Sequence, residues 1–272
     1  MKSPISSLAA FCVVAVLLVA APLSHSSLIA HWTMDEASGN ITDQVAGIVG
    51  TASPTGLTYG QASVPAGTYG AIILTPEVAT AFGQAIAFER ASAGYFSIGA
   101  PSIIAGLAPG GSVGSFTVMA WVNANIGAAS NHRIFSTGLP DGWGVGLSNV
   151  DQVIFTAFNV ADLRSGNAPS SNNQWQHLAF TYDDGGVEVF INGNSVFTAS
   201  SAVNAPTVSD FRIGGNANDT DSFNGLIDEL KIFDTTLSRE QIIFQASIPE
   251  PSAALFLLPG LAFTFLARRR RS

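Results

Sequence analysis

Hydrophobic and polar residues alternate most clearly between residues 174 and 197. Apolar side chains occupy every second position from Leu178 to Tyr182, and again from Val187 to Ile191. A period of two is typical of half-buried β-strands. A polar turn separates the two runs, and Asn192-Gly193 then supplies two residues that accept positive φ in a type I′ turn. The pattern predicts three consecutive antiparallel strands.

Shorter runs with the same period, bounded by Gly, Pro, Ser and Asn, predict further strands along the chain. The segment 116–123 is apolar on both faces, which indicates a central strand covered on both sides. Residues 52–84 have weak periodicity and predict an irregular connection with one short strand, and Ser238–Gln241 predicts a capping box that opens a helix. The other predicted strands are 28–36, 85–90, 95–98, 132–137, 142–149, 153–159, 211–215 and 226–233.

The stretch with the clearest alternation also resembles a known family, the laminin-G-like, concanavalin-A-like jelly rolls. The residues that carry the resemblance are Trp175, His177, Ala179, Tyr182, Asp183, Asn192 and Gly193. It implies an all-β fold, a two-sheet antiparallel jelly-roll sandwich, in which 85–90 and 95–98 pair around a small loop. It does not define a function, because this fold hosts lectins, glycosidases, adhesive modules and spacers.

Two hydrophobic segments lie outside the predicted domain. Residues 1–26 combine Lys2, an apolar run from Leu8 to Ala21 and small polar residues, which predicts a secretory signal helix. Near the other end, Ala253–Ala267 is apolar and would form a helix about 22 Å long, shorter than the roughly 30 Å of a bilayer core. The predicted organisation is a signal peptide (1–26), a laminin-G-like domain (27–247) and a C-terminal segment (248–272).

The C-terminal segment resembles a PEP-CTERM sorting signal. Its motif residues are Pro249, Glu250, Pro251, Arg268, Arg269, Arg270 and Arg271, which flank the predicted transmembrane segment 253–267. The resemblance implies an exosortase as processing partner and transient anchoring in the inner membrane of a Gram-negative bacterium. Delivery to the cell surface or extracellular matrix would follow. The alternative is a plain tail anchor that stays in the membrane.

The charge of the chain limits which classes of partner it can bind, and its cysteine content limits how the domain can be stabilised. The chain has a net charge of −8 and one cysteine, Cys12, which lies within the predicted signal peptide. Only one of its 19 acidic residues, but five of its 11 basic residues, lie outside residues 27–249, so the mature region is still more acidic. Such a surface disfavours nucleic acid and anionic membranes, and no disulfide frames the domain.

Catalytic motifs are weak. A retaining glucanase of this fold needs two carboxylates on one strand face, about 5 Å apart. Asp228 and Glu229 are adjacent, so on a regular strand they point to opposite faces, and no third acid follows at the required spacing. We therefore expect a protein that is not an enzyme.

Calcium binding is the stronger chemical hypothesis. Asp228 shares parity with Leu230 and Ile232, which predicts an inward-facing carboxylate that needs partners. Asp35 and Asp43 lie in the opening segment of the domain and could reach the last strand, where their oxygens would suit structural Ca²⁺. In the alternative, Asp228 accepts hydrogen bonds and no ion is present.

Sugar binding requires an exposed aromatic side chain. Trp32, Trp121 and Trp175 occupy predicted strands and are expected in the core. Trp143 lies between Gly142 and Gly144, which would suit either an exposed stacking platform for a glycan or a core tryptophan between closely packed strands.

The sequence favours an exported, non-enzymatic module of the cell surface or matrix with an adhesion or interaction role. The alternative is a carbohydrate-binding lectin of the exopolysaccharide matrix, with exopolysaccharide or surface glycans as partners. A glycoside hydrolase is the third reading.

Overall fold

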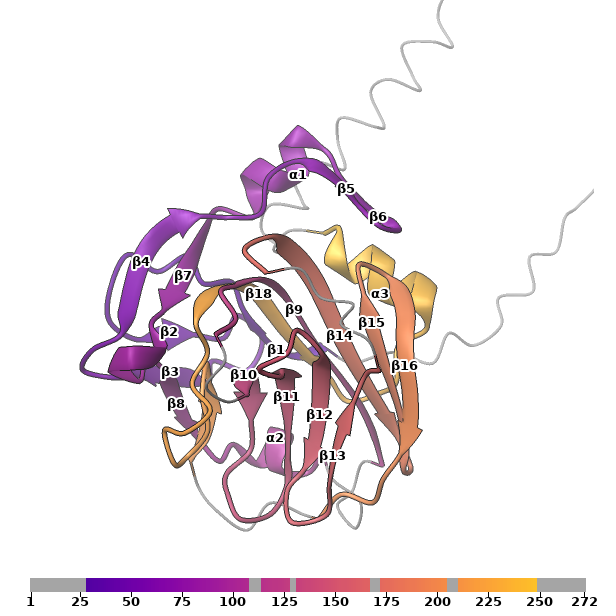
Figure 1. The fold of residues 1–272 in the computed structure, drawn as a ribbon. Helices are drawn as coiled ribbons and strands as arrows, with labels where there is room; N and C mark the ends of the chain where they lie inside the picture. The colour runs from indigo at the N-terminus through magenta and orange to yellow at the C-terminus, as the bar shows by residue number, and fades with distance from the viewer. Residues whose placement is uncertain (1–27, 108–113, 128–130, 167–171, 205–209, 249–272) are drawn as a thin grey trace, which may run out of the picture.

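The computed structural model describes residues 28–107, 114–127, 131–166, 172–204 and 210–248. These residues form two antiparallel sheets of eight strands each, packed face to face (Figure 1). The all-β, two-sheet jelly-roll prediction is confirmed. Within the described residues no helix is long and apolar enough to cross a membrane. The predicted signal and sorting segments lie outside the described residues.

The first sheet, sheet A, contains the strands predicted with most confidence from alternation. Its strands are β1 (Leu28–Trp32), β4 (Leu57–Ala62), β7 (Gln84–Phe88), β9 (Ser115–Ala124), β14 (Trp175–Asp183), β15 (Gly186–Ile191), β16 (Asn194–Ser200) and β18 (Gly225–Phe233). Their order is β16-β15-β14-β9-β18-β7-β4, and β1 pairs with β18. Asn192 and Gly193 have φ values of 53° and 73°, as the predicted type I′ turn requires.

Sheet B covers one face of sheet A. Its strands are β2 (Ile41–Thr42), β3 (Val49–Ala52), β8 (Phe96–Gly99), β10 (His132–Ser136), β11 (Trp143–Leu147), β12 (Val153–Ala157), β13 (Ala161–Arg164) and β17 (Phe211–Ile213). The order is β13-β12-β11-β10-β17-β8-β3-β2. The expected pairing of 85–90 with 95–98 is wrong, because β7 belongs to sheet A and β8 to sheet B. The short 3-10 turn Arg90–Ser92 carries the chain across.

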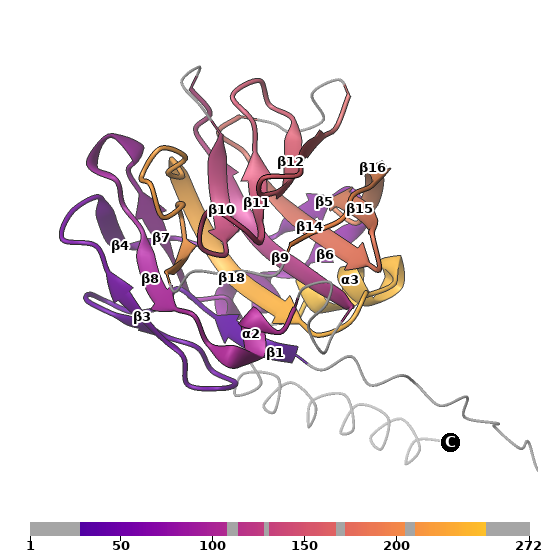
Figure 2. The ribbon, with the colours of Figure 1, turned by 90° about the horizontal axis from the view of Figure 1, so that it is seen from below.

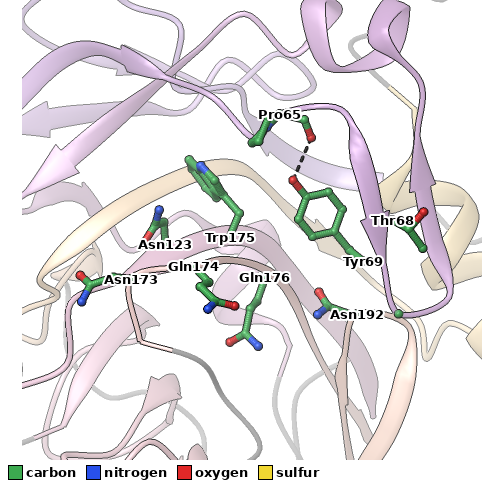
Figure 3. A pocket seen from close by; sticks show the side chains of 10 residues that line it. Pro65, Thr68, Tyr69, Asn123, Asn173, Gln174, Trp175, Gln176 and Asn192 are labelled. Carbon is green, nitrogen blue, oxygen red and sulfur yellow. Dashed lines mark hydrogen bonds between the residues drawn. The ribbon is translucent and has the colours of Figure 1, made fainter.

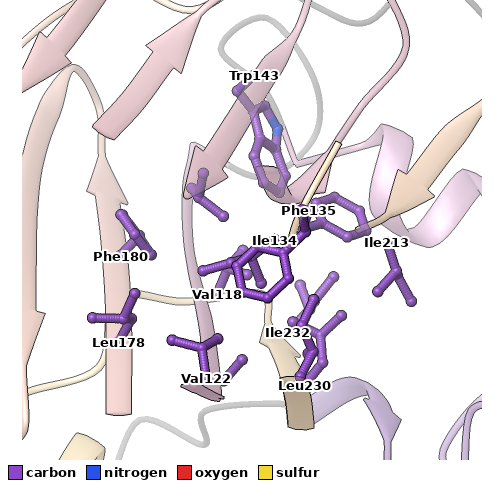
Figure 4. Packing of buried hydrophobic residues seen from close by; sticks show 14 of the residues in the cluster. Val118, Val122, Ile134, Phe135, Trp143, Leu178, Phe180, Ile213, Leu230 and Ile232 are labelled. Carbon is purple, nitrogen blue, oxygen red and sulfur yellow. The ribbon is translucent and has the colours of Figure 1, made fainter. Parts of the chain in front are cut away.

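The main core fills the space between the two sheets. Val118 and Val122 on β9, Leu178 and Phe180 on β14, and Ile232 on β18 face sheet B, and all are almost fully buried (Figure 4). Burying side chains of this size contributes about 1.5–3 kcal/mol each. The alternation seen in the sequence therefore reflects one apolar face turned toward sheet B.

The opposite, outer face of sheet A has its own cover. A two-stranded hairpin, β5 (Gly67–Tyr69) with β6 (Ile72–Leu74), and the helix α3 (Arg239–Ala246) pack there around Met119 and Trp121 of β9. Figure 2 shows the hairpin and α3 on the same side of the molecule. The helix opens with the predicted capping box between Ser238 and Gln241.

The sequence analysis predicted fewer strands and helices in residues 52–84 than the structure contains. The predicted short strand corresponds to β6, but β4, β5 and the helix α1 (Pro76–Ala81) were missed. β4 pairs with β7 as an edge strand of sheet A, and every second residue is exposed, with only half-buried residues between. The short helix α2 (Ser102–Ala105), which follows β8, was also not predicted.

Candidate functional site

Trp143 is a core residue, so its prediction as an exposed glycan platform is wrong. Its exposed fraction is 0%, its ring stacks on Phe116 with centroids 4.4 Å apart, and its indole nitrogen donates to the Leu107 carbonyl at 2.9 Å. A Cβ on the neighbouring Gly144 would lie 3.1 Å from Phe158. The flanking glycines therefore serve close packing, the alternative that the sequence had left open.

The three aspartates predicted to hold calcium do not form one set. Both oxygens of Asp43 are occupied by backbone amides, from His31 (2.6 Å) and Val45 (3.0 Å) on Oδ1 and from Ala46 (2.7 Å) and Ile48 (3.3 Å) on Oδ2. Among the described residues, no three His, Cys, Asp or Glu side chains come together as a metal site. The trio therefore does not fit a calcium ion.

Asp35 and Asp228 are separate from Asp43. Asp35 accepts from the Gln84 amide at 2.6 Å, and its charge contributes to raising the pKa of Asp228. Asp228 accepts from the Ser63 hydroxyl, and its Oδ1 is buried without a partner among the described residues. This buried oxygen, which has no partner in the described part of the chain, is the feature of Asp228 that fits the calcium prediction.

A β-bulge reverses the predicted direction of Asp228. Glu229 has a φ of 51°, and the register of β18 with β9 shifts between Asp228 and Lys231. Asp228 is paired with Trp121, whose ring belongs to the outer cluster, while Ile227 and Leu230 belong to the main core. The parity argument failed because the bulge inserts an extra residue. Asp228 thus lies on the outer face of sheet A.

Several buried charges share this outer face. Glu229 Oε2 lies 2.8 Å from His31 Nε2 and 3.0 Å from Lys231 Nζ. Burial by itself would raise the pKa of Glu229, but the Lys231 ammonium and His31 lower it below its usual range. Burial, followed by the charge of Glu229, raises the pKa of Asp228 well above its usual range. One carboxyl is therefore ionised and its neighbour tends to keep its proton.

His177 belongs to the same layer and is a structural residue. Burial, with the charge of Lys231, lowers its pKa to about 3, so its imidazole is neutral. Its ring contacts Trp121 edge-on with centroids 5.2 Å apart, and its backbone N–H donates to Asn192 Oδ1 at 2.8 Å. This bond ties the turn between β15 and β16 to β14.

A pocket of about 420 Å³ opens beside this layer, where the β5–β6 hairpin faces the start of β14 (Figure 3). Its volume is within the range of roughly 300–1,000 Å³ that is usual for small-ligand sites. Most of the lining side chains are uncharged amides or aromatic rings. The lining residues are Pro65, Thr68, Tyr69, Gly70, Asn123, Asn173, Gln174, Trp175, Gln176 and Asn192.

Two aromatic rings shape the pocket. Tyr69 packs edge-on against Trp121 with centroids 4.9 Å apart, and its hydroxyl donates to the Pro65 carbonyl at 2.8 Å. Trp175 is half-buried and packs against the outer cluster. In Figure 3 it lies between Tyr69 on one side and Asn123 and Asn173 on the other. One part of the indole is fixed by packing, and the remainder is accessible.

The amides are placed by the sheet and by a tight loop. Asn123 is the direct cross-strand partner of Trp175, so both side chains leave the same face of sheet A. Asn173 has a φ of 56°, and its N–H donates to the Ala124 carbonyl at 2.7 Å. The side chains of Asn123, Asn173 and Gln174 make no hydrogen bonds with the described residues. Their donors and acceptors are available to a ligand.

The sequence predicted none of these residues as a site. Trp175 was expected in the core, which is wrong because it is half-buried and lines the pocket. Asn192 was recognised only as part of the strand signature, and Tyr69 lay in the segment judged irregular. The available signal was the polar run Asn172–Gln176 immediately before a strong strand, because loops at the ends of rigid strands commonly carry binding residues.

Comparison with known proteins agrees with this architecture. The model of the concanavalin A-like lectin/glucanases superfamily matches residues 92–243. The chain belongs to this superfamily. The matched range includes the three consecutive strands β14, β15 and β16 and six of the ten pocket residues. The β5–β6 hairpin, which forms the opposite wall of the pocket, precedes this range. No curated protein matches the chain.

Solved members with this architecture are distant in sequence. Domain 4 of AbnA, an extracellular GH43 arabinanase from Geobacillus stearothermophilus solved with arabinotriose, is 22% identical and has a TM-score of 0.52. The match covers 82% of this chain and 99% of that domain. Trypanosoma rangeli sialidase, solved with the inhibitor DANA, is 14% identical with a TM-score of 0.52, over 79% of this chain and 32% of the sialidase. At these identities the likeness shows the shared fold.

Membership of this superfamily leaves hydrolases and lectins equally open, so the chemistry of the pocket matters. Its described lining contains no Asp, Glu, His, Lys or Arg. Asp228 and Glu229 lie below the surface, with exposed fractions of 0% and 2%. The pocket can form hydrogen bonds and stack on a ring, and its described lining offers hydroxyl and amide groups but no carboxyl, imidazole or ammonium group for proton transfer.

Proposed function

We propose that this protein is an exported, non-enzymatic carbohydrate-binding module, and that the pocket beside Trp175 is its sugar site. The observation that carries the proposal is the combination of a half-exposed indole, fixed from below, with several unpaired side-chain amides around it. Adhesion to a glycan-rich surface or matrix would follow from such a site.

The lining suits the chemistry of sugars. A pyranose or furanose ring presents C–H groups on one face and hydroxyls at its edge. The C–H face packs on an aromatic surface, which contributes apolar burial, while each amide offers both an acceptor and two donors for hydroxyls. The arabinanase domain with the same fold was solved with arabinotriose, so the fold is compatible with an oligosaccharide ligand.

The hydrolase alternative is less well supported. In most families glycoside hydrolysis uses two carboxyl groups that flank the scissile bond, one of them able to donate a proton. In the described lining neither is present, and the adjacent pair Asp228 and Glu229 is buried and bonded to Ser63, His31 and Lys231. We therefore propose binding without turnover.

Export and processing complete the proposal. The predicted signal peptide and the PEP-CTERM-like segment would deliver the domain to the surface or matrix after an exosortase acts on it. Mass spectrometry of the exported protein should find a C-terminus near Pro249–Pro251, with residues 253–272 absent. Recovery of the intact tail would favour the plain anchor instead.

The sugar site is tested by one substitution and a matched control. Trp175→Ala should abolish binding of the purified domain to any saccharide that the wild type retains on a glycan array and in calorimetry. Phe244→Ala changes an aromatic residue on α3 that is 61% exposed and outside the pocket lining, and it should bind as the wild type does. Equal binding by the wild type and Trp175→Ala would refute the site.

A further inference from the structure

The absence of charge in the described pocket lining supports a second inference, about which sugars bind. This inference rests on the proposed function and makes it more specific. All ten lining residues are uncharged. Arg239 approaches the neighbouring turn, where it contacts Asn194 at 3.3 Å, but it also lies 3.9 Å from Glu240. Lys231, a cation on the same side of sheet A, is 3% exposed. Its ammonium is bonded to Glu229 and to the carbonyls of Gln245 and Ile248.

An acidic sugar would find no partner in such a pocket. A carboxylate or sulfate that leaves water needs a guanidinium, an ammonium or several aligned N–H groups to offset its lost hydration. The chain also has a net charge of −8, so its field repels polyanions at low ionic strength. A neutral sugar does not meet either penalty, because hydroxyls exchange hydrogen bonds with water for hydrogen bonds with amides.

We infer that the Trp175 pocket is selective for neutral saccharides, discriminates against uronic, sialic and sulfated sugars, and works without a bridging metal ion. The last point follows from the donor set. Calcium prefers carboxylate oxygens among its ligands, and the described lining offers only amide, hydroxyl and backbone oxygens. Asp35 and Asp228 are not among the lining residues.

Matched pairs of probes isolate the charge. We would measure calorimetric affinities for galacto-oligosaccharide against oligogalacturonate, manno-oligosaccharide against oligomannuronate, and lactose against sialyllactose, each with and without EDTA. The wild type should bind at least one neutral probe at least about tenfold more tightly than its acidic partner, a difference of about 1.4 kcal/mol. EDTA should leave that affinity unchanged.

A gain-of-charge variant supplies the complementary test. Gln174 is exposed at the pocket rim, so Gln174→Arg should fold normally. It should tighten binding of the acidic partner roughly tenfold at low salt, with the gain shrinking as salt rises. A charge-preserving control, Gln174→Asn, should not change the preference.

The outcomes separate the two proposals. If an acidic probe binds more tightly than its neutral partner and Trp175→Ala abolishes that binding, the selectivity is overturned while the sugar site stands. Loss of Trp175-dependent binding in EDTA overturns the metal-free recognition alone. If no probe binds in a Trp175-dependent way, the proposed function fails and the selectivity fails with it.

Discussion

The two faces of sheet A bury residues of β9 and β14 in different ways. The inner face meets sheet B through aliphatic and aromatic side chains, such as Val118 and Phe180. The outer face also has an apolar cluster around Trp121, but it surrounds buried ionisable groups, among them His177 and Lys231. The pocket beside Trp175 opens on the outer face. A face that is covered by a hairpin and a helix, and not by a whole sheet, leaves room for polar groups and for a ligand.

Two tryptophans express the same contrast. Trp143 on β11 lies in the main core, with its ring stacked and its N–H satisfied. Trp175 on β14 lies at the edge of the outer cluster and is half-buried. The same type of side chain therefore serves packing in one layer and, in the proposed sugar site, recognition in the other. Substitutions can separate these roles, and they are considered from the largest expected effect to the smallest.

Trp143→Ala should have the largest effect. Removal of a fully buried indole leaves a cavity in the main core and should lower the free energy of unfolding by about 3–5 kcal/mol. Urea denaturation measures this loss. The fraction that remains folded should bind saccharide like the wild type. A stability change below about 1 kcal/mol, together with lost binding, would return Trp143 to the role of platform.

Lys231→Met should cost about 3 kcal/mol, because it leaves Glu229 ionised and buried with one partner fewer. It also removes the donor to the Gln245 and Ile248 carbonyls. Arg239, an exposed cation at the start of α3, provides the control, since Arg239→Met should change stability by less than about 0.5 kcal/mol. Equal losses in the two variants would contradict a special role for the buried ammonium.

Asp228→Asn should change the pH dependence of stability. The pKa of Asp228 is raised in the folded state, so the folded protein holds this proton more tightly than the unfolded chain. The wild type therefore loses stability as pH rises above about 4, the unfolded value. The variant lacks this loss, and the difference between the two thermal midpoints should widen in its favour from pH 4 to 7.

A bound calcium ion would instead make the wild type more stable than Asp228→Asn. If Asp35 and Asp228 hold the ion, the wild type should melt at a lower temperature in chelator, and Asp228→Asn should not respond. At about 100 times the dissociation constant, bound metal adds roughly 2.7 kcal/mol. An identical thermal midpoint of the wild type with and without chelator would contradict the predicted calcium ion.

Gln174→Ala should have the smallest effect on stability. The residue is exposed at the rim, so the free energy of unfolding should change by less than about 0.5 kcal/mol. Loss of one amide from the pocket should still weaken sugar binding measurably, by about 0.5–1.5 kcal/mol for one hydrogen bond. Unchanged affinity would remove Gln174 from the contact set.

The sequence predicted the sandwich well because strands such as β9, β14 and β15 carry their own signal. Alternation, the Asn192-Gly193 turn and the capping box at Ser238 are local features, and local features decide those elements. The edge strand β4 and the hairpin strand β5 were missed because their burial depends on partners distant in sequence.

The site was not predictable for a related reason. Its walls come from the hairpin, from β9, from the loop before β14 and from the Asn192 turn, so no contiguous motif marks it. The direction of Asp228 depended on a single bulge residue, Glu229 at φ 51°, and a strict period of two cannot anticipate such a bulge. The sequence analysis expected Trp175 in the core and left Trp143 open as a platform, whereas the structure leaves Trp175 half-buried at the pocket and buries Trp143 completely. Both residues lie in strands, and position in a strand alone does not decide how fully a ring is covered.

The contacts of Lys231 have a mechanical consequence. Its ammonium holds the carbonyls of Gln245 and Ile248, and the Trp121 indole donates to the Ala246 carbonyl at 3.1 Å. A pulling force applied at Ile248 therefore acts first on these side-chain bonds and only then on β18, which is clamped between β9 and β7. The end of α3 would therefore detach first under load, while the sandwich stays folded. The pocket wall formed by β9 and β14 would keep its shape.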